Sequence, residues 1–260
     1  MRSILVYADH TAAMTNRLET ALSIARLTDG HVTAVVDTPV SRYISMDPMG
    51  GSYVASDALR DALEQDDSYA GTIQEHLGRE DVPFDVMRCE EEPVDALAAA
   101  ARLADVVLVS KGCPFAGQLA MVARCPVLVV AEGKRLTLPL ASVCIGWDGG
   151  DEAALALRSV VPLLAGVGAV HVLTVAEKAG GFPATDALRY LSRHGIKAEL
   201  HELPRQGTTE ETLSAATARL GADLLVMGAF GHSRIREFLF GGVTRYFLEA
   251  EDVPALFLAH

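Results

Sequence analysis

The residues best suited to chemistry form one glycine-rich stretch, Met227 to Arg245. Its pattern is Gly, two residues, Gly, nine residues, Gly-Gly-x-Thr. Glycines such as Gly228 and Gly231 permit positive φ angles and let a ligand approach the main chain closely. Since exposed peptide N–H groups hold anions well, the pattern predicts a loop that binds a ribose and its phosphates.

The second part of this loop supplies further donors. Ile235, Phe238 and other apolar residues can anchor the intervening arm, which would bring Gly241 and Gly242 back beside the first glycines. The pair would then offer main-chain N–H groups to the same ligand.

A short helix predicted over Thr244 to Ala250 begins where the loop ends. Its first N–H groups and the positive end of its dipole favour an anion, and the Thr244 hydroxyl can donate to a phosphate oxygen. Arg234 and Arg245 can add charge. His232 and Ser233 suit a phosphate contact or a helix cap equally well.

Two aspartates follow matching apolar runs, one in each half of the chain. Asp148 can contact a ligand or cap the following helix, and we slightly favour the ligand. Asp9 has no intact glycine loop opposite it, so we expect a structural role there. Trp147 is expected to pack at the top of the sheet rather than to stack on a base.

The elements that must position these residues occur twice. The matching segments are Ser3–Asp9 with Ser142–Asp148, His31–Asp37 with Ala169–Val175, Arg102–Val109 with Arg219–Met227, and Pro126–Ala131 with Pro254–Ala259. Each half therefore alternates apolar strands with helices, which predicts a parallel sheet covered on both faces. Right-handed crossovers make this a doubly wound, Rossmann-like α/β fold.

We predict two tandem domains, residues 1–133 and 140–260, joined by a linker from Lys134 to Pro139. The closing strands are candidate edges for pairing between the halves, which we favour, or between chains. Ligands of doubly wound sheets bind where the strand order reverses. That reversal is expected between the first and fourth strands, at Asp148 and Met227–Gly228.

The first half departs from this pattern. Ser110 to Phe115 replace the glycine loop, and the closing strand follows about ten residues sooner than in the second half. We expect this half not to bind phosphate by the same route but to pack against the second half. An insert, Pro39 to Ser56, is predicted to act as a mobile lid.

Composition narrows the classes of partner. The net charge of −12 and pI near 5.1 disfavour nucleic acid and anionic lipid. The chain has no signal-peptide pattern or membrane-length apolar run, so we expect a cytoplasmic protein. Four cysteines without a CxxC pair and eight histidines without zinc-like spacing predict free thiols and no metal site.

The loop pattern, with an aspartate ending the first strand, resembles the nucleotide-binding branch of the universal stress protein (UspA-like) family in its tandem form. The resemblance extends over essentially the whole chain, with one family domain in each half, and it implies an adenine nucleotide alpha-hydrolase-like fold. It implies that Asp148 contacts the adenosine portion and that the main chain near Val175 and Met227 contacts adenine. The phosphates would meet Gly228, Gly231, Gly241, Gly242, Val243 and Thr244.

One departure concerns Gly242, where the family usually has Ser or Thr. Loss of a hydroxyl donor costs about 1 kcal/mol, which would weaken the site without abolishing it. The resemblance implies ATP, or ADP or AMP, with or without Mg²⁺. It does not distinguish among these nucleotides.

Three functions fit the sequence. The leading hypothesis is a regulatory, stress-response protein that binds an adenine nucleotide without efficient catalysis. The sequence lacks a Walker lysine loop, kinase HRD and DFG motifs, and an evident residue to orient a water molecule. The alternatives are a slow nucleotide-hydrolysing enzyme and an interaction scaffold that binds no nucleotide.

Overall fold

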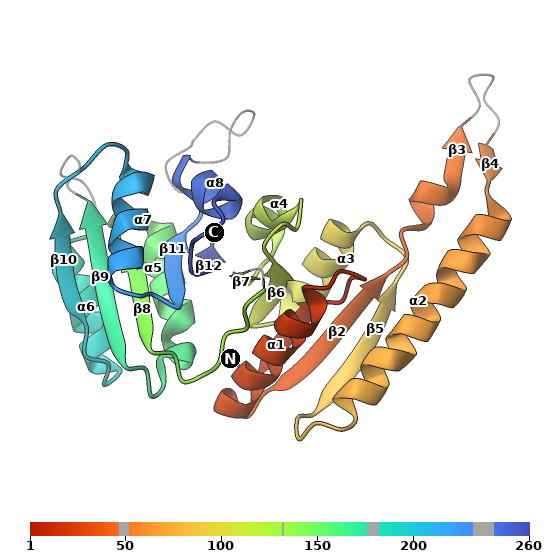
Figure 1. Cartoon of the computed structure of the whole chain (residues 1–260), viewed down its shortest axis with the longest axis horizontal. Helices are drawn as coiled ribbons and strands as arrows, with labels where there is room; N and C mark the ends of the chain where they lie inside the picture. The colour runs from red at the N-terminus through yellow and green to blue at the C-terminus, as the bar shows by residue number, and fades with distance from the viewer. Residues whose placement is uncertain (47–51, 132, 176–181, 231–241) are drawn as a thin grey trace.

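A computed structural model describes residues 1–46, 52–131, 133–175, 182–230 and 242–260. Two halves with the same order of elements lie side by side and share one ten-stranded sheet (Figure 1). The predicted fold class, two tandem doubly wound α/β units, is confirmed. The domain limits themselves stay predictions.

The first half forms one end of the sheet, in the order β5-β2-β1-β6-β7. Among the described residues, short 3₁₀ helices lie at Val40–Tyr43 and Ala101–Leu103 in this half and at Val161–Leu164 in the second half. The other elements of this half are β1 (Ser3–Tyr7), α1 (Met14–Thr28), β2 (His31–Asp37), β3 (Ile44–Met46), β4 (Ser52–Val54), α2 (Ser56–Leu77), β5 (Phe84–Cys89), α3 (Pro93–Ala100), β6 (Val106–Ser110), α4 (Ala116–Val122) and β7 (Val127–Val130).

The second half repeats this arrangement in the order β10-β9-β8-β11-β12. Its strand order reverses between β8 and β11, as the sequence predicts. The elements are β8 (Ser142–Gly146), α5 (Asp151–Val160), β9 (Ala169–Val175), α6 (Ala184–Arg193), β10 (Glu199–Leu203), α7 (Thr209–Arg219), β11 (Leu224–Gly228), α8 (Gly242–Glu249) and β12 (Ala255–Ala259).

The halves join through their closing strands. β7 and β12 pair antiparallel, with Leu128 opposite Phe257, whereas the other pairs of the large sheet are parallel. This confirms the expected pairing between the halves. The linker lies along α1, where the N–H groups of Leu136 and Leu138 donate to Thr20 Oγ1 and Ser23 Oγ at 3.0 and 2.9 Å.

Two apolar layers cover the two faces of the sheet. One contains buried residues of α1, α2, α5 and α6, and the other contains buried residues of α3, α4, α7 and α8. Because both faces are covered, the central strands are continuous apolar runs rather than alternating ones. Within the described ranges, no helix combines the length and hydrophobicity needed to cross a membrane.

The insert predicted as a lid contains β3 and β4, which form a separate antiparallel pair. Figure 1 shows this pair projecting past the end of β2, next to the start of α2. Residues 47–51 lie outside the described part of the chain, so the lid stays a prediction.

Candidate functional site

Asp148 lies just beyond β8, at the carboxyl edge of the second half. Its side chain is exposed, and its Oδ1 accepts a hydrogen bond from the N–H of Gly150 at 2.8 Å. Gly150 is the residue before α5, so the carboxylate stabilises the start of that helix. Of the two structural roles considered from the sequence, the bond to a turn N–H is present, and α5 has no side-chain cap; the carboxylate also faces solvent.

Met227 and Gly228 end the neighbouring strand β11. Ile145 of β8 is in register with Val226 of β11, so Asp148 and Gly228 leave the sheet at the same edge. Val175 ends β9 on the other side of β8, and the Trp147 N–H donates to Leu173 O at 2.8 Å. Parallel order thus brings these predicted residues to one edge.

Gly228 is needed for a reason other than the predicted one. The positive φ angle that a glycine permits is not used there, because the residue continues β11. A Cβ at this position would lie 2.6 Å from Ala153 N and 2.7 Å from Glu152 C. Without a side chain, the first turn of α5 can pack directly onto the end of the strand.

The left-handed residue is instead Phe230, with a φ of 64°. A bulky residue in this region costs roughly 1–3 kcal/mol, which its surroundings must offset. Phe230 is buried, and its ring meets that of His260 edge-on with centroids 6.0 Å apart. In the first half, Gly112 takes the corresponding turn with a φ of 84°.

The helix after the loop begins earlier than predicted. α8 starts at Gly242 rather than Thr244, which places Gly242, Val243 and Thr244 in its first turn. The side chain of Thr244 is only 2% exposed, which limits its access to a ligand. Glu210 Oε1 lies 3.9 Å from where a Cβ on Gly242 would be, so a carboxylate already lies near the positive end of α8.

Five predicted residues, Gly231, His232, Ser233, Arg234 and Gly241, lie outside the described residues. Arg245 is described and lies on the surface of α8, where its Nε donates to Glu249 Oε1 at 2.7 Å. This pair is exposed on both sides, so it holds the arginine only weakly in place.

An aromatic residue that the sequence analysis did not select lies beside Asp148. Phe182 is 60% exposed, and its N–H donates to Gly149 O at 3.0 Å. Its carbonyl accepts a hydrogen bond from Trp147 Nε1 at 2.9 Å. Trp147 is itself buried in the core, as expected. The sequence gives little signal for Phe182, which is a single aromatic residue before Pro183.

In the first half, an arginine bridges the equivalent strand ends. Arg17 is fully buried; its Nη2 donates to Asp9 Oδ1 at 2.7 Å and its Nη1 to Ser110 Oγ at 3.1 Å. Strand registers match Asp9 and Ser110 with Asp148 and Gly228. Ala156 takes the place of Arg17 in the second half. The guanidinium thus occupies space that the second half leaves free of a long side chain.

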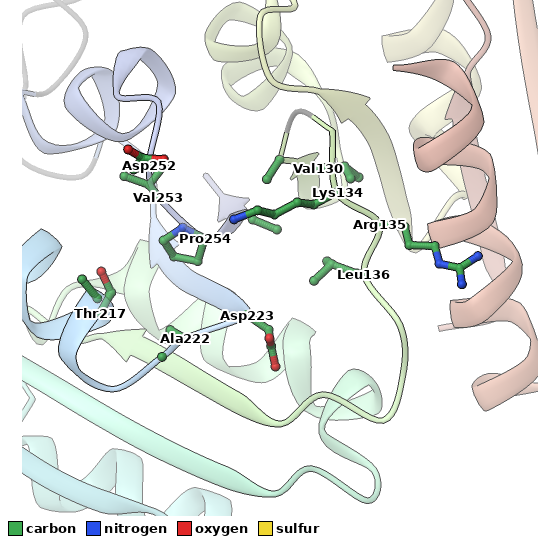
Figure 2. A pocket seen from close by; sticks show the side chains of 14 residues that line it. Val130, Lys134, Arg135, Leu136, Thr217, Ala222, Asp223, Asp252, Val253 and Pro254 are labelled. Carbon is green, nitrogen blue, oxygen red and sulfur yellow. The ribbon is translucent and has the colours of Figure 1, made fainter. Parts of the chain in front are cut away.

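A cleft between the halves has a different lining. Its volume is about 290 Å³, and it lies next to Lys134, Asp223 and Pro254. Figure 2 shows Lys134 extending toward Pro254, whereas Arg135 points away to α1, 3.7 Å from Glu19. None of the predicted site residues that the structure describes lines this cleft. It is therefore distinct from the predicted site.

Comparison with known proteins agrees with this architecture. Residues 141–258 match the sequence model of the Universal stress protein family. A universal stress protein from Archaeoglobus fulgidus has a TM-score of 0.71 at 14% identity, over 98% of this chain and 97% of that chain. A functionally unknown protein from Pseudomonas aeruginosa has a TM-score of 0.61 at 16% identity, over 100% and 92%.

At these identities the structural likeness establishes the fold of both halves. No curated protein sequence matches the chain. The fold and the glycine-rich edge define a tandem α/β protein with two doubly wound units. The second half, residues 141–258, belongs to the universal stress protein family by sequence, and the tandem fold of the whole chain is similar to that of the Archaeoglobus fulgidus protein.

Proposed function

We propose that the second half binds an adenine nucleotide at the carboxyl edge of β8 and β11, and that the protein is a cytoplasmic stress-response regulator rather than an efficient enzyme. ATP is the leading candidate, with ADP or AMP as alternatives and Mg²⁺ as a possible companion. In this proposal Asp148 contacts the adenosine portion, and the glycine-rich loop contacts the phosphates.

The difference between the halves carries the proposal. At equivalent strand ends the first half has Arg17 and Ser110, whereas the second half has Ala156 and Gly228. Ala156 removes the long side chain that lies beside the aspartate in the first half, whereas the main chain of α5 takes the place of a side chain at Gly228. Room for a ligand next to an exposed carboxylate is what a ribose requires, and the first half does not provide it.

In this proposal the adenine base lies near the ends of β9 and β11, the two strands next to β8. The main chain at Val175 and Met227 offers polar groups at the ends of two strands flanking β8. Phe182 offers an exposed ring beside the turn that follows Asp148. Stacking on an aromatic ring typically contributes about 1–3 kcal/mol per base. Phe182 is therefore our candidate for a platform under the adenine.

The phosphates would be held by the loop and the start of α8. Gly228, Gly231, Gly241, Gly242 and Val243 would supply main-chain N–H groups, and His232, Ser233, Arg234 and Thr244 would supply side chains. N–H groups at a helix start attract anions because of the helix dipole. The sequence contains no motif known to position an attacking water molecule, so we expect slow hydrolysis at most.

One observation favours a second candidate, a scaffold that binds no nucleotide. Glu210 lies close to the start of α8, and its charge would repel a phosphate there unless a cation or an arginine intervened. In this alternative the loop is kept for its architecture alone.

The test is direct. Purified protein is denatured, any released nucleotide is identified by mass spectrometry, and the thermal midpoint is measured with ATP, ADP or AMP, with and without Mg²⁺. We expect Asp148→Ala to lose the nucleotide-dependent rise, whereas Asp151→Ala, an exposed aspartate in the first turn of α5, keeps it. Absence of both nucleotide and shift would favour the scaffold, and rapid turnover would favour the enzyme.

A further inference from the structure

Three potential metal ligands meet on the outer two strands of the second half. His171 lies on β9, and Glu199 and His201 lie on β10, the edge strand of the sheet. Glu199 is in register with His171, and His201 follows two residues later on the same face. Leu173 and Leu203 belong to the layer that includes α7, so the three ligands lie on the face that α7 covers.

The distances among the three ligand atoms fit one small cation. His171 Nδ1 lies 3.0 Å from His201 Nε2, and Glu199 Oε2 lies 3.9 and 3.7 Å from these nitrogens. Tetrahedral zinc, with bonds of about 2.0–2.2 Å, places its ligand atoms about 3.3–3.6 Å apart. Shifts of a few tenths of an ångström would turn this triangle into one face of the tetrahedron.

Burial also suits a cation. The side chains of His171 and His201 are 13% and 19% exposed, whereas that of Glu199 is 71% exposed. The imidazoles are therefore held in place by the sheet, and the carboxylate can close over a cation from the solvent side. Two imidazoles and one carboxylate are a common zinc-ligand set, with water in the fourth position.

We propose that His171, Glu199 and His201 form a binding site for a divalent cation of the zinc class, and that the cation ties the edge strand β10 to β9. At present one proton joins the two ring nitrogens in a hydrogen bond. On binding, the liganding nitrogen of the donating ring gives up its proton and the other nitrogen of the same ring takes one up, so both imidazoles stay neutral and each offers a lone pair to the cation.

The site belongs to the second half alone and is separate from the proposed nucleotide site. Strand registers place Thr33, Asp85 and Met87 at the corresponding positions of the first half. His171 precedes Val175 by four residues of extended strand, about 13 Å at ~3.3 Å per residue. Zinc binding is therefore expected with or without a bound nucleotide.

The experiment uses the full-length protein, free of affinity tags and stripped of metal with a chelator. Zinc is titrated against a competing chromophoric chelator, and Co²⁺ is added separately because its absorption reports tetrahedral coordination. We expect one zinc ion per chain and a tetrahedral Co²⁺ spectrum. His171→Ala and His201→Ala should each weaken zinc binding by at least about 100-fold, since even outer-shell changes cost 10–100-fold.

His31→Ala is the matched control. His31 lies 3.3 Å from Asp85 on the equivalent strands of the first half, and the described part of the chain offers this pair no third ligand. This variant should bind zinc as the unaltered protein does. Glu199→Gln changes an exposed side chain, which makes it safe for folding, and should weaken binding by about 10-fold.

Circular dichroism checks that each variant is folded. The proposal is overturned if the unaltered protein binds no zinc at micromolar concentrations, or if Glu199→Gln and both folded histidine variants bind it as tightly as His31→Ala does.

Discussion

The Arg17 guanidinium donates a hydrogen bond to the Asp9 carboxylate at 2.7 Å inside the first half. The arginine is fully buried, and its aliphatic stem and head lie between α1 and the ends of β1 and β6. The ring of Tyr7 lies 5.6 Å from the guanidinium and adds a cation–π contact. The pair fixes the carboxyl edge of the first half in a form that contains its own cation.

We predict that Arg17→Met lowers the free energy of unfolding by about 3 kcal/mol, because it leaves Asp9 without its buried partner. Urea denaturation monitored by circular dichroism measures this. The control is Arg60→Met, whose partner Asp57 is exposed, and its change should stay within about 0.5 kcal/mol. Equal effects of the two changes would contradict the structural role of Arg17.

The reverse change tests the proposed nucleotide site. Ala156→Arg places a guanidinium at the position equivalent to Arg17, within reach of Asp148. We expect the variant to fold and to lose its thermal shift with ATP, because the arginine occupies the ligand space and pairs with the carboxylate. Ala156→Leu adds apolar volume without charge and separates crowding from pairing. An unchanged ATP response in the arginine variant would argue against this location.

Two glycine substitutions are expected to change the free energy of unfolding in opposite directions. Gly228→Ala brings a methyl group against the main chain of Glu152 and Ala153, and should cost about 3 kcal/mol of unfolding free energy. Gly71 lies inside α2 with no atom within 4 Å of an added Cβ, so Gly71→Ala should gain about 0.5–1 kcal/mol. Chemical denaturation of both variants measures these free energies. An unchanged free energy of unfolding in Gly228→Ala would contradict the close packing of α5 against Gly228.

The junction of the halves should survive a break in the linker. A protease site inserted after Gly133 would be cut without loss of the β7–β12 pair, whose residues Leu128 and Phe257 are fully buried. We expect the two fragments to co-elute in size-exclusion chromatography and to part only in denaturant. Leu128→Asp in the cut protein should release them. Separation of the unaltered fragments would mean that the linker alone holds the halves together.

The cysteines should react slowly in the native state. All four are free thiols, and burial raises the pKa of Cys113 to about 11 and that of Cys144 to about 12. At pH 8 a thiol with a pKa near 11 is about 0.1% thiolate, the reactive form. Titration with an aromatic disulfide should therefore be slow until guanidinium unfolds the chain. Rapid native reaction of Cys144 would contradict its burial.

Much of the fold follows from local pattern. The matching segments Arg102–Val109 and Arg219–Met227 each end in an apolar run that predicts a buried parallel strand, and β6 and β11 are found there. The internal repeat then predicts the reversal point and the pairing of the closing strands. These features depend on residue type and order, which a sequence displays directly.

The site was less predictable because it depends on contacts between distant segments. The need for a glycine at position 228 comes from the approach of α5, not from a local turn. The sequence around Arg17 has no feature that distinguishes it from other helical arginines. Only the pairing of β1 with β6 brings Asp9 and Ser110 to its two ends. The histidine pair was missed for the same reason, since its members come from two strands and match no spacing motif.

Because the halves are covalently linked, their pairing does not depend on protein concentration. A pair assembled from separate chains comes apart on dilution, as mass action requires. Here the strand β12 that meets β7 is carried on the same polypeptide, so the ratio of the two units is one to one however scarce the protein becomes. Each unit could therefore lose or acquire a ligand site without losing its neighbour, and the contrast between Arg17 and Ala156 is one such divergence.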